Sequence, residues 1–316
     1  MKIFGPVPSR RLGQSLGINN IPPKICSYSC VYCQVGKSLK ISVDRTAYYS
    51  PEKIIQLTRN KVYKAKEYGE HIDYLTFVPD GEPTLDINLG LEIKGIKPLG
   101  IKTAVITNGS LLWRPDVRKE LQPADLVSVK IDAADEFIWK KINHPHKNLL
   151  FNEVLNGIKQ FAKAYKGQLI TETMLVKGIN DNIVSFQNLA SYIAEIDPHI
   201  AYLSVPIRPP AFDHVEPADE EKLNEAFQVF NNQVSRVELL IGYEGNAFAF
   251  TGDIEEDILS ITAVHPMRED AVDKLLLKAR ANQKVIDKLI NEGKITKTIY
   301  GNNRFYIRKL RKGTEI

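Results

Sequence analysis

The sequence predicts an α/β protein, namely an open (β/α)6 barrel, which is a partial TIM barrel, followed by a small winged-helix domain. Two observations lead to this fold class. Short apolar, β-branched runs alternate with amphipathic stretches, a pattern typical of repeated βα units. From about residue 260 the pattern changes to helical stretches followed by a hairpin. We therefore expect a barrel over residues 1–255 and a winged-helix-like basic domain over residues 256–316.

Six apolar runs predict the strands of the barrel: Gln14–Asn19, Asp73–Val78, Lys102–Thr107, Leu126–Asp132, Leu169–Val176 and Ala201–Pro206. The helices expected between them include Pro51–Tyr68 and Asn152–Tyr165. After the sixth strand we expect a helix over Pro217–Asn231 and then an apolar run, Val237–Ile241. In such a barrel, ligands collect at the C-terminal ends of the strands, where the βα loops meet. The candidate site is therefore expected there.

The composition is that of an ordinary soluble protein. Of the 316 residues, 43% are hydrophobic and 25% are charged, which excludes a mainly disordered chain and a fibrous repeat. No apolar stretch has membrane-spanning length and the first residues form no apolar signal core, so we expect a cytoplasmic protein with no membrane contact. The net charge of +4 does not by itself indicate a polyanionic partner, but residues 260–316 carry +7 and the remainder −3.

The three cysteines of the chain, Cys26, Cys30 and Cys33, lie within eight residues of one another. An odd number so closely grouped does not make a disulfide framework, and a cytoplasmic chain keeps its thiols reduced. A zinc site would need a fourth ligand, yet the first histidine is His71. An iron–sulfur cluster on three thiolates leaves one iron open for a substrate or cofactor. The pattern favours such a cluster, with a zinc-binding or incidental group as the alternative.

Polar residues follow the second and third expected strands. After the second, Gly81 would let the backbone approach a ligand closely and Glu82 could accept a hydrogen bond from an ammonium group. The alternative is a βα turn with Glu82 near a helix N-terminus. After the third, Asn108 and Ser110 could bond to cofactor groups, or could equally form an ordinary turn at a helix start.

In the fourth expected strand, apolar and polar residues alternate, which places Ser128, Lys130 and Asp132 on one face. An inward lysine is costly unless it is paired or used, so Lys130 and Asp132 are candidate catalytic residues facing the substrate. The alternative is a simple Lys130–Asp132 ion pair. One face of the fifth strand also points inward, which makes Glu172 a candidate cofactor ligand. Arg208, in a rigid Arg-Pro-Pro turn, would suit a carboxylate or phosphate, or equally a surface ion pair.

The spacing Cys-x3-Cys-x2-Cys, with Tyr32 before the third cysteine, resembles the cluster loop of the radical S-adenosylmethionine (radical SAM) superfamily. The resemblance implies a [4Fe–4S] cluster on the three thiolates, with S-adenosylmethionine bound to the fourth iron. It implies an electron donor, such as flavodoxin or ferredoxin, and a 5′-deoxyadenosyl radical that abstracts a hydrogen atom. The segment around Glu82 resembles the Gly-Gly-Glu motif of that family, with Asp80 in place of the first glycine. The residues that would hold S-adenosylmethionine are Tyr32, Gly81, Glu82, Asn108, Ser110 and Glu172.

The opening stretch, residues 5–19, resembles one subgroup, the relatives of the archaeal enzymes that make the wyosine base of tRNA. The resemblance extends to residues 143–146, residues 177–181 and the Arg208 turn. Arg10 and Arg11 in this stretch could bind a substrate phosphate or carboxylate, or form a solvated patch. The wyosine enzymes carry a second cluster on further cysteines, and this chain has none left. The expected chemistry therefore needs one cluster, one S-adenosylmethionine and hydrogen abstraction.

The basic C-terminal segment is expected to form helices over Asp270–Leu277 and Ala281–Asn291, then a hairpin of Lys294–Tyr300 and Arg304–Lys309 around Gly-Asn-Asn. Winged helices of this kind often bind nucleic acid. The alternatives are a protein-docking module and a basic surface that is only solvated. The expected phosphate contacts are Lys284, Lys288, Lys297, Arg304 and Arg308.

The substrate class follows from the subgroup and this segment together. We expect an RNA base, such as one of tRNA, with a peptide or protein as the alternative. A third hypothesis is a redox-sensing regulator that binds DNA through the winged helix and carries an iron–sulfur cluster.

Overall fold

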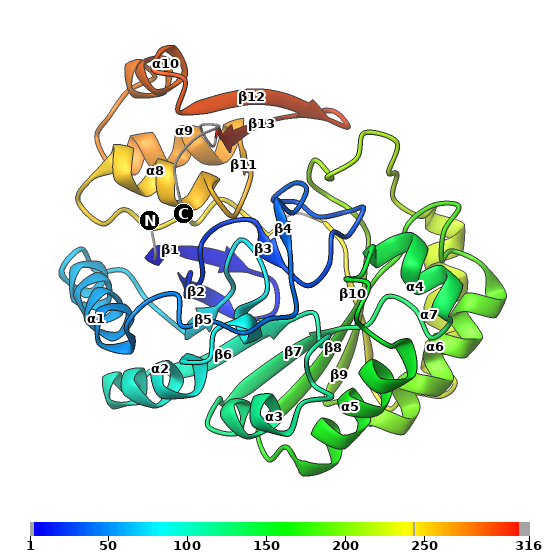
Figure 1. Ribbon diagram of the computed structural model, residues 1–316. Coiled ribbons are helices and arrows are strands. Elements are labelled where there is room, and N and C mark those ends of the chain that lie inside the picture. Colours follow the sequence, from blue (N-terminus) through cyan, green and yellow to red (C-terminus); the bar gives the residue numbers. More distant parts are fainter. Residues whose placement is uncertain (1–2, 243, 310–316) are drawn as a thin grey trace.

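The computed structural model describes residues 3–242 and 244–309, and an eight-stranded sheet forms its centre (Figure 1). The strand order is β1-β2-β5-β6-β7-β8-β9-β10; β1 runs antiparallel to β2, and all the other neighbours are parallel. The strands are β1 (Ile3–Ser9), β2 (Gly13–Ile18), β5 (Tyr74–Phe77), β6 (Lys102–Thr107), β7 (Leu126–Lys130), β8 (Gln168–Met174), β9 (Ile200–Ser204) and β10 (Val237–Leu240). This mixed α/β architecture is consistent with the expected partial barrel.

Helices follow the parallel strands and form an outer layer around the sheet (Figure 1). The first of them begins where the sequence supplies both a cap and a proline: the side chain of Ser50 accepts from the amide of Lys53, and Pro51 occupies the first turn. The helices are α1 (Pro51–Glu67), α2 (Leu89–Ile96), α3 (Pro115–Leu121), α4 (Glu136–Asn143), α5 (Phe151–Ala164), α6 (Ile183–Ile196) and α7 (Glu220–Asn231), with 3-10 turns η1 (Pro83–Leu85) and η2 (Lys97–Leu99). Their apolar faces enclose the main core between helices and sheet.

All six expected strands are present, with ends that differ by a residue or two. The fourth, β7, ends at Lys130 instead of Asp132, although the amide of Ile131 still donates to the Glu172 carbonyl at 2.9 Å. The apolar run after α7 is a seventh parallel strand, β10, paired with β9. The edge strand β1 was not expected. It contains Pro6 and Pro8, which cannot donate to a ladder and which only an edge strand tolerates.

The C-terminal segment forms three helices and a three-stranded sheet of order β11-β13-β12. Its hairpin is tighter than expected: Tyr300 pairs with Asn303, so the turn consists of Gly301, at φ +55°, and Asn302. The second expected helix begins at Lys284, three residues later than expected. The elements are α8 (Ile254–Thr262), β11 (Met267–Arg268), α9 (Glu269–Lys278), α10 (Lys284–Asn291), β12 (Ile295–Tyr300) and β13 (Asn303–Arg308).

The core of this segment includes side chains of the first strand. Phe4 and Val7 of β1 belong to the same buried cluster as Ile258 of α8 and Leu275 of α9. Phe4 also packs over Gly17 of β2 so closely that a Cβ there would lie 1.9 Å from its ring. The division into domains of residues 1–255 and 256–316 stays a prediction.

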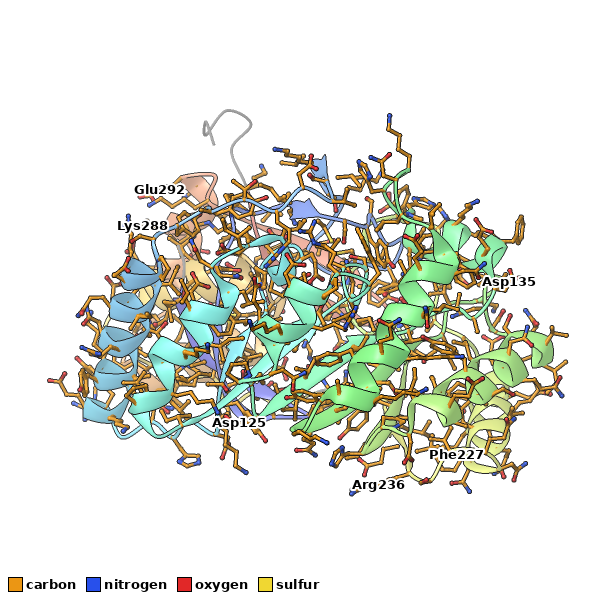
Figure 2. The ribbon with its side chains drawn as sticks, turned by 60° about the horizontal axis from the view of Figure 1, so that its bottom comes forward. Asp125, Asp135, Phe227, Arg236, Lys288 and Glu292 are labelled. Atoms are coloured by element: carbon orange, nitrogen blue, oxygen red, sulfur yellow. The ribbon has the colours of Figure 1, made fainter. Side chains whose placement is uncertain are left out.

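The candidate site lies at the edge of the sheet where the parallel strands end. The cysteine loop follows β2 and contains two short parallel strands, β3 (Ile25–Cys26) and β4 (Lys40–Ile41). The parallel strands begin at the other end of the sheet. That end is marked in Figure 2 by Asp125 and Arg236, which directly precede β7 and β10. Within the described residues, no helix has both the length and the apolar character needed to span a bilayer.

Candidate active site

The cysteine loop is held against the end of β5 by its backbone. Ile25 forms a parallel bridge with Gly81, and its carbonyl accepts from the amide of Glu82 at 3.1 Å. The amide of Lys24 donates to the Asp80 carbonyl at 2.6 Å. The segment after β5, expected to approach a ligand, therefore also carries the loop that bears the cysteines.

Gly81 makes this close approach possible. Its φ is +155°, and a Cβ on it would lie 1.9 Å from the Ile25 carbonyl oxygen, so no other residue fits without moving the loop. At Asp80, where the family motif has glycine, a carboxylate oxygen lies 3.1 Å from the Lys24 ammonium nitrogen. Burial raises the pKa of Asp80 to about 6 although Lys24 opposes the shift. This ion pair is a second link between the loop and the end of β5.

Each cysteine sulfur faces at least one N–H donor. The donors are the Tyr28 amide (3.5 Å) and Asn108 Nδ2 (3.6 Å) for Cys26, Asn143 Nδ2 (3.3 Å) for Cys30, and the Val35 amide for Cys33. Hydrogen bonds to sulfur are among the contacts by which proteins tune thiolate-ligated iron–sulfur clusters. The environment of all three sulfurs therefore suits thiolate ligands.

Burial raises the pKa of all three thiols. The pKa of Cys30 rises to about 12, mainly from burial and further from the nearby Asp132 carboxylate. For Cys26, burial and then the Glu82 carboxylate raise the pKa well above its usual value, and burial also raises that of Cys33. Thiolates at such positions need a bound cation, and metal binding supplies one while it releases the protons. The donor set thus fits an iron–sulfur cluster.

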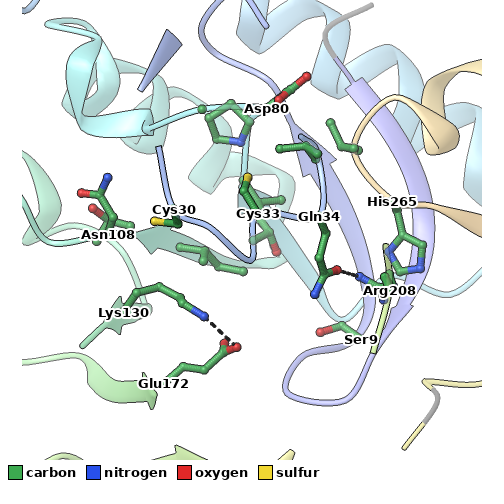
Figure 3. A pocket seen from close by; sticks show the side chains of 18 of the residues that line it. Ser9, Cys30, Cys33, Gln34, Asp80, Asn108, Lys130, Glu172, Arg208 and His265 are labelled. Carbon is green, nitrogen blue, oxygen red and sulfur yellow. Dashed lines mark hydrogen bonds and ion pairs between the residues drawn. The ribbon is translucent and has the colours of Figure 1, made fainter. Parts of the chain in front are cut away.

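A cavity of about 320 Å³ opens beside the loop (Figure 3). Its lining includes every predicted site residue except Ser110 and Asp132, namely Cys26, Cys30, Tyr32, Cys33, Gly81, Glu82, Asn108, Lys130 and Glu172. Residues from four strand ends, those of β5, β6, β7 and β8, and from the cysteine loop therefore meet in one space. This is the arrangement expected of βα loops at the C-terminal edge of a parallel sheet.

Glu82 is almost fully buried, and its carboxylate accepts several hydrogen bonds. Oε1 accepts from the Thr84 amide (3.0 Å), the Thr84 hydroxyl (2.6 Å) and the Thr107 hydroxyl (2.6 Å), while Oε2 accepts from the Asn108 amide (2.8 Å). Glu82 thereby caps η1 and joins the ends of β5 and β6. The βα turn with Glu82 at a helix N-terminus, which was the alternative to a ligand-binding role, is thus formed. Oε2 has one protein donor, which leaves it able to accept a second hydrogen bond from a ligand.

Asn108 and Ser110 contact the cysteine loop. Asn108 Nδ2 donates to Ser27 Oγ at 2.9 Å in addition to its contact with the Cys26 sulfur. Ser110 is fully buried, and its hydroxyl lies 2.6 Å from that of Ser27. Asn108 therefore reaches both the cavity and the loop, whereas Ser110 supports the loop from behind.

Lys130 pairs with Glu172 and not with Asp132. Its Nζ lies 3.1 Å from Glu172 Oε1 and 4.8 Å from the centre of the Tyr32 ring, and burial lowers its pKa although Asp132 opposes the shift. The Asp132 carboxylate is buried outside the cavity lining, where it accepts from the Tyr32 hydroxyl and from Asn143 Nδ2 (2.8 Å). Lys130 therefore faces the cavity, while Asp132 fixes Tyr32 and, through Asn143, the surroundings of Cys30.

A family model described as the radical SAM superfamily matches residues 20–190 of this sequence. The chain belongs to the radical SAM superfamily. Among curated relatives, UPF0026 protein MJ1312 of Methanocaldococcus jannaschii is 46% identical over 310 residues, covering 98% of this chain and 96% of the relative. A UPF0026 protein of Helicobacter pylori is 35% identical over 224 residues, covering 70% of this chain and 71% of the relative. These relatives extend the likeness beyond the matched domain.

Among solved structures, the structure of TYW1 with a lysine-pyruvate adduct bound has a TM-score of 0.54 and 20% identity, over 70% of this chain and 74% of that one. At this identity the likeness shows the fold. Radical SAM proteins are enzymes that bind a [4Fe–4S] cluster and S-adenosylmethionine and need an electron donor, which confirms the expected cofactors and enzyme class. The alternative of a redox-sensing DNA-binding regulator is therefore set aside.

The cavity of this radical SAM enzyme also has a second group of charged residues that the sequence revealed only in part. Arg10, Arg11 and Arg208 were recognised as candidate anion ligands, and all three line the cavity. Glu244 and His265, which lie among them, were missed. Both come from irregular segments between elements, where no periodicity or motif indicates which way a side chain points.

The titration of His265 should be visible in the stability of the protein. Burial, and then Arg208, lower its pKa from 6.5 to about 3. Below pH 6.5 the imidazole of His265 is protonated in the unfolded chain but stays neutral in the native state. The free energy of unfolding therefore decreases as the pH is lowered from 6.5 towards 3, by up to about 1.4 kcal/mol per pH unit. Glutamine does not titrate, so His265→Gln should lack this loss. In anaerobic urea titrations, the free energy of unfolding of the variant should therefore rise relative to that of wild type as the pH is lowered below about 6.5. The control is His214→Gln, because that side chain is exposed; a constant difference for both variants would contradict the prediction.

Proposed function

We propose that Cys26, Cys30 and Cys33 ligate a [4Fe–4S] cluster and that the enzyme abstracts a hydrogen atom from a substrate in the adjoining cavity. The observation that carries this proposal is that three half-buried thiols, each with an N–H donor at its sulfur, line one cavity. Held by these three thiolates, a bound cluster would supply the one-electron reductive cleavage of S-adenosylmethionine that makes hydrogen abstraction possible. Flavodoxin or ferredoxin would supply the electron.

The residues of this chain would bind and orient the reactants. Glu82 Oε2 would accept from the ammonium group of S-adenosylmethionine, and Tyr32, Gly81 and Asn108 would border the same ligand. Glu172 also lines the cavity, but its carboxylate contacts Lys130 and Arg11, so we propose that it orders these cations toward the substrate. Lys130 is the proposed catalytic residue facing the substrate. Ser110 and Asp132 would act indirectly, through Ser27 and through Tyr32.

For the substrate we propose an RNA base, with a peptide or protein as the alternative. The order α8-β11-α9-α10-β12-β13 supports a winged helix, and the segment charge of +7 supports a polyanionic partner. Four of the five expected phosphate contacts, however, bond to the protein itself: Lys288 to Glu255, Lys297 and Arg304 to Glu269, and Arg308 to the Leu259 carbonyl. The proposal of RNA binding therefore depends on the order of the elements and on the total charge of the segment, since most of the expected phosphate contacts are paired within the protein. A cytoplasmic location is proposed with it, since reduced thiols persist there.

One anaerobic assay tests both parts of the proposal. The protein is reconstituted with iron and sulfide, reduced with dithionite in the presence of S-adenosylmethionine, and assayed for 5′-deoxyadenosine with and without bulk tRNA. We expect 5′-deoxyadenosine in both reactions and a faster rate with tRNA, because a bound substrate consumes the radical productively. No product from a fully assembled cluster would refute the hydrogen-abstraction function. Product whose rate is unaffected by tRNA but raised by peptide mixtures would refute the RNA assignment alone.

A further inference from the structure

The part of the cavity beyond the cysteine loop is built from segments that are far apart in the sequence. Arg208 follows β9 and lies between Gln34, which follows Cys33, and His265, which lies between α8 and β11 (Figure 3). Its guanidinium donates to Gln34 Oε1 and contacts Glu244 Oε1, and the Arg10 Nε lies 3.7 Å from the same Glu244 oxygen. Five loops thus converge on one group of polar side chains.

The charges in this part of the cavity do not balance. Arg10 and Arg208 share the carboxylate of Glu244, while Arg11 and Lys130 share that of Glu172. Four cations therefore face two carboxylates, a net charge of +2 among these six side chains with His265 neutral, and of +1 when the Asp132 carboxylate, which acts on Lys130, is counted as well. Excess charge that is largely removed from water is costly unless a counter-charge binds to it.

Several polar atoms of the group also have no hydrogen-bond partner in the described part of the chain. They are Nε of Arg10, Nε of Arg208, Nε2 of His265 and Oε2 of Glu244. Arg208 and His265 are each only 8% exposed. Buried polar atoms are normally satisfied by protein, water or ligand, and a guanidinium group bonds best to a carboxylate or phosphate through two parallel hydrogen bonds. At Arg10 and Arg208, unpaired guanidinium donors and excess positive charge thus coincide.

We propose that Arg10, Arg208 and His265 form a subsite for a doubly charged anionic group of the substrate, either a phosphate or a pair of carboxylates. The inference rests on the proposed function, because the subsite places this group beside Cys33 in the cavity where hydrogen abstraction would occur. It also gives the C-terminal segment a direct part in substrate binding, since that segment supplies His265 and Val264 to the cavity wall.

The test uses inorganic phosphate and malonate as probes, titrated calorimetrically into the full-length reconstituted protein without reductant, with sodium chloride at equal ionic strength as the reference. We expect one or both dianions to bind, and binding to weaken about tenfold or more in Arg208→Gln, because a charge-assisted bidentate contact is lost. The matched control is Arg236→Gln, an exposed arginine at the opposite edge of the sheet that is paired with Glu238 (Figure 2). Phosphate binding alone or malonate binding alone identifies the group; binding of neither overturns the inference.

Two further measurements keep the outcome interpretable. Arg10→Gln, on a different loop, should weaken binding in the same way, which guards against misfolding of one variant, and circular dichroism checks both. Binding is repeated with saturating S-adenosylmethionine: if the cofactor displaces the anion, the anion occupied the cofactor's own carboxylate site and the inference fails. Wild-type 5′-deoxyadenosine formation without anion binding would refute the subsite alone, and anion binding without 5′-deoxyadenosine would refute the proposed function alone.

Discussion

Replacing Cys30 with alanine is expected to abolish 5′-deoxyadenosine formation. A cluster with an open iron has only three protein ligands, and the chain holds no other cysteine that could take the place of the lost one. Even changes to residues behind a metal ligand commonly lower affinity or activity about 10- to 100-fold, so loss of a ligand should exceed about 100-fold. Iron and sulfide per chain, the charge-transfer absorption of the cluster and 5′-deoxyadenosine are measured together after anaerobic reconstitution.

Ser29→Ala is the matched control for this variant. Ser29 precedes Cys30 on the same loop, and among the described residues its hydroxyl makes one long contact, 3.4 Å, with the amide of Ser38. We expect near wild-type iron content and product from Ser29→Ala. Full iron content in Cys30→Ala would contradict the assignment of Cys30 as a ligand, and product at the wild-type rate would contradict the role of the cluster in cleavage.

The second large effect is expected from Gly81→Ala. The added methyl group would lie 1.9 Å from the Ile25 carbonyl oxygen and 2.8 Å from Ile21 Cδ1, so the loop that carries Cys26 must move. Backbone strain and overpacking each cost about 1–3 kcal/mol, so the variant should lose about 2–5 kcal/mol of unfolding free energy. It should also bind less iron, because Cys26 directly follows the displaced Ile25. Urea denaturation and iron analysis measure the two effects.

Gly69→Ala separates the clash from the cost of the backbone angle. Gly69 also has a positive φ, +71°, but a Cβ there would meet nothing within 4 Å. We expect it to lose about 1 kcal/mol and to keep its iron, because it carries only the conformational cost. Equal losses in the two variants would show that the contact between Gly81 and Ile25 does not hold the cysteine loop.

The sequence predicted the parallel part of the sheet because each buried strand is a short apolar run bounded by turn residues. It did not predict β1, because Pro6 and Pro8 argue against a strand and only the position of β1 at the edge makes them acceptable. The turn of the hairpin was placed one residue too long because three consecutive turn-forming residues, Gly301 to Asn303, do not reveal where pairing starts. Position within the sheet and pairing register are tertiary properties.

The parts of the candidate site that depend on the spacing of residues along the chain could be predicted from the sequence. Three cysteines at the right intervals, and polar residues at the ends of successive parallel strands, must come together in any such fold. The partner of Lys130 was not predictable, because Asp132 lies on the same strand whereas Glu172 lies on the neighbouring one in register with Lys130. Glu244 and His265 come from loops whose paths depend on the packing of distant elements.

The shared core of β1 and the C-terminal helices has a consequence for the order in which the protein forms during synthesis. Phe4 and Val7 leave the ribosome some 250 residues before their partners on α8 and α9. At about 5–20 residues per second, these two side chains wait roughly 10–50 seconds before their cluster can close. The nascent chain therefore carries an unfinished β1 cluster while the residues between β1 and α8 are made. Closure of the sheet edge that bears Arg10 is coupled to helices that are made much later.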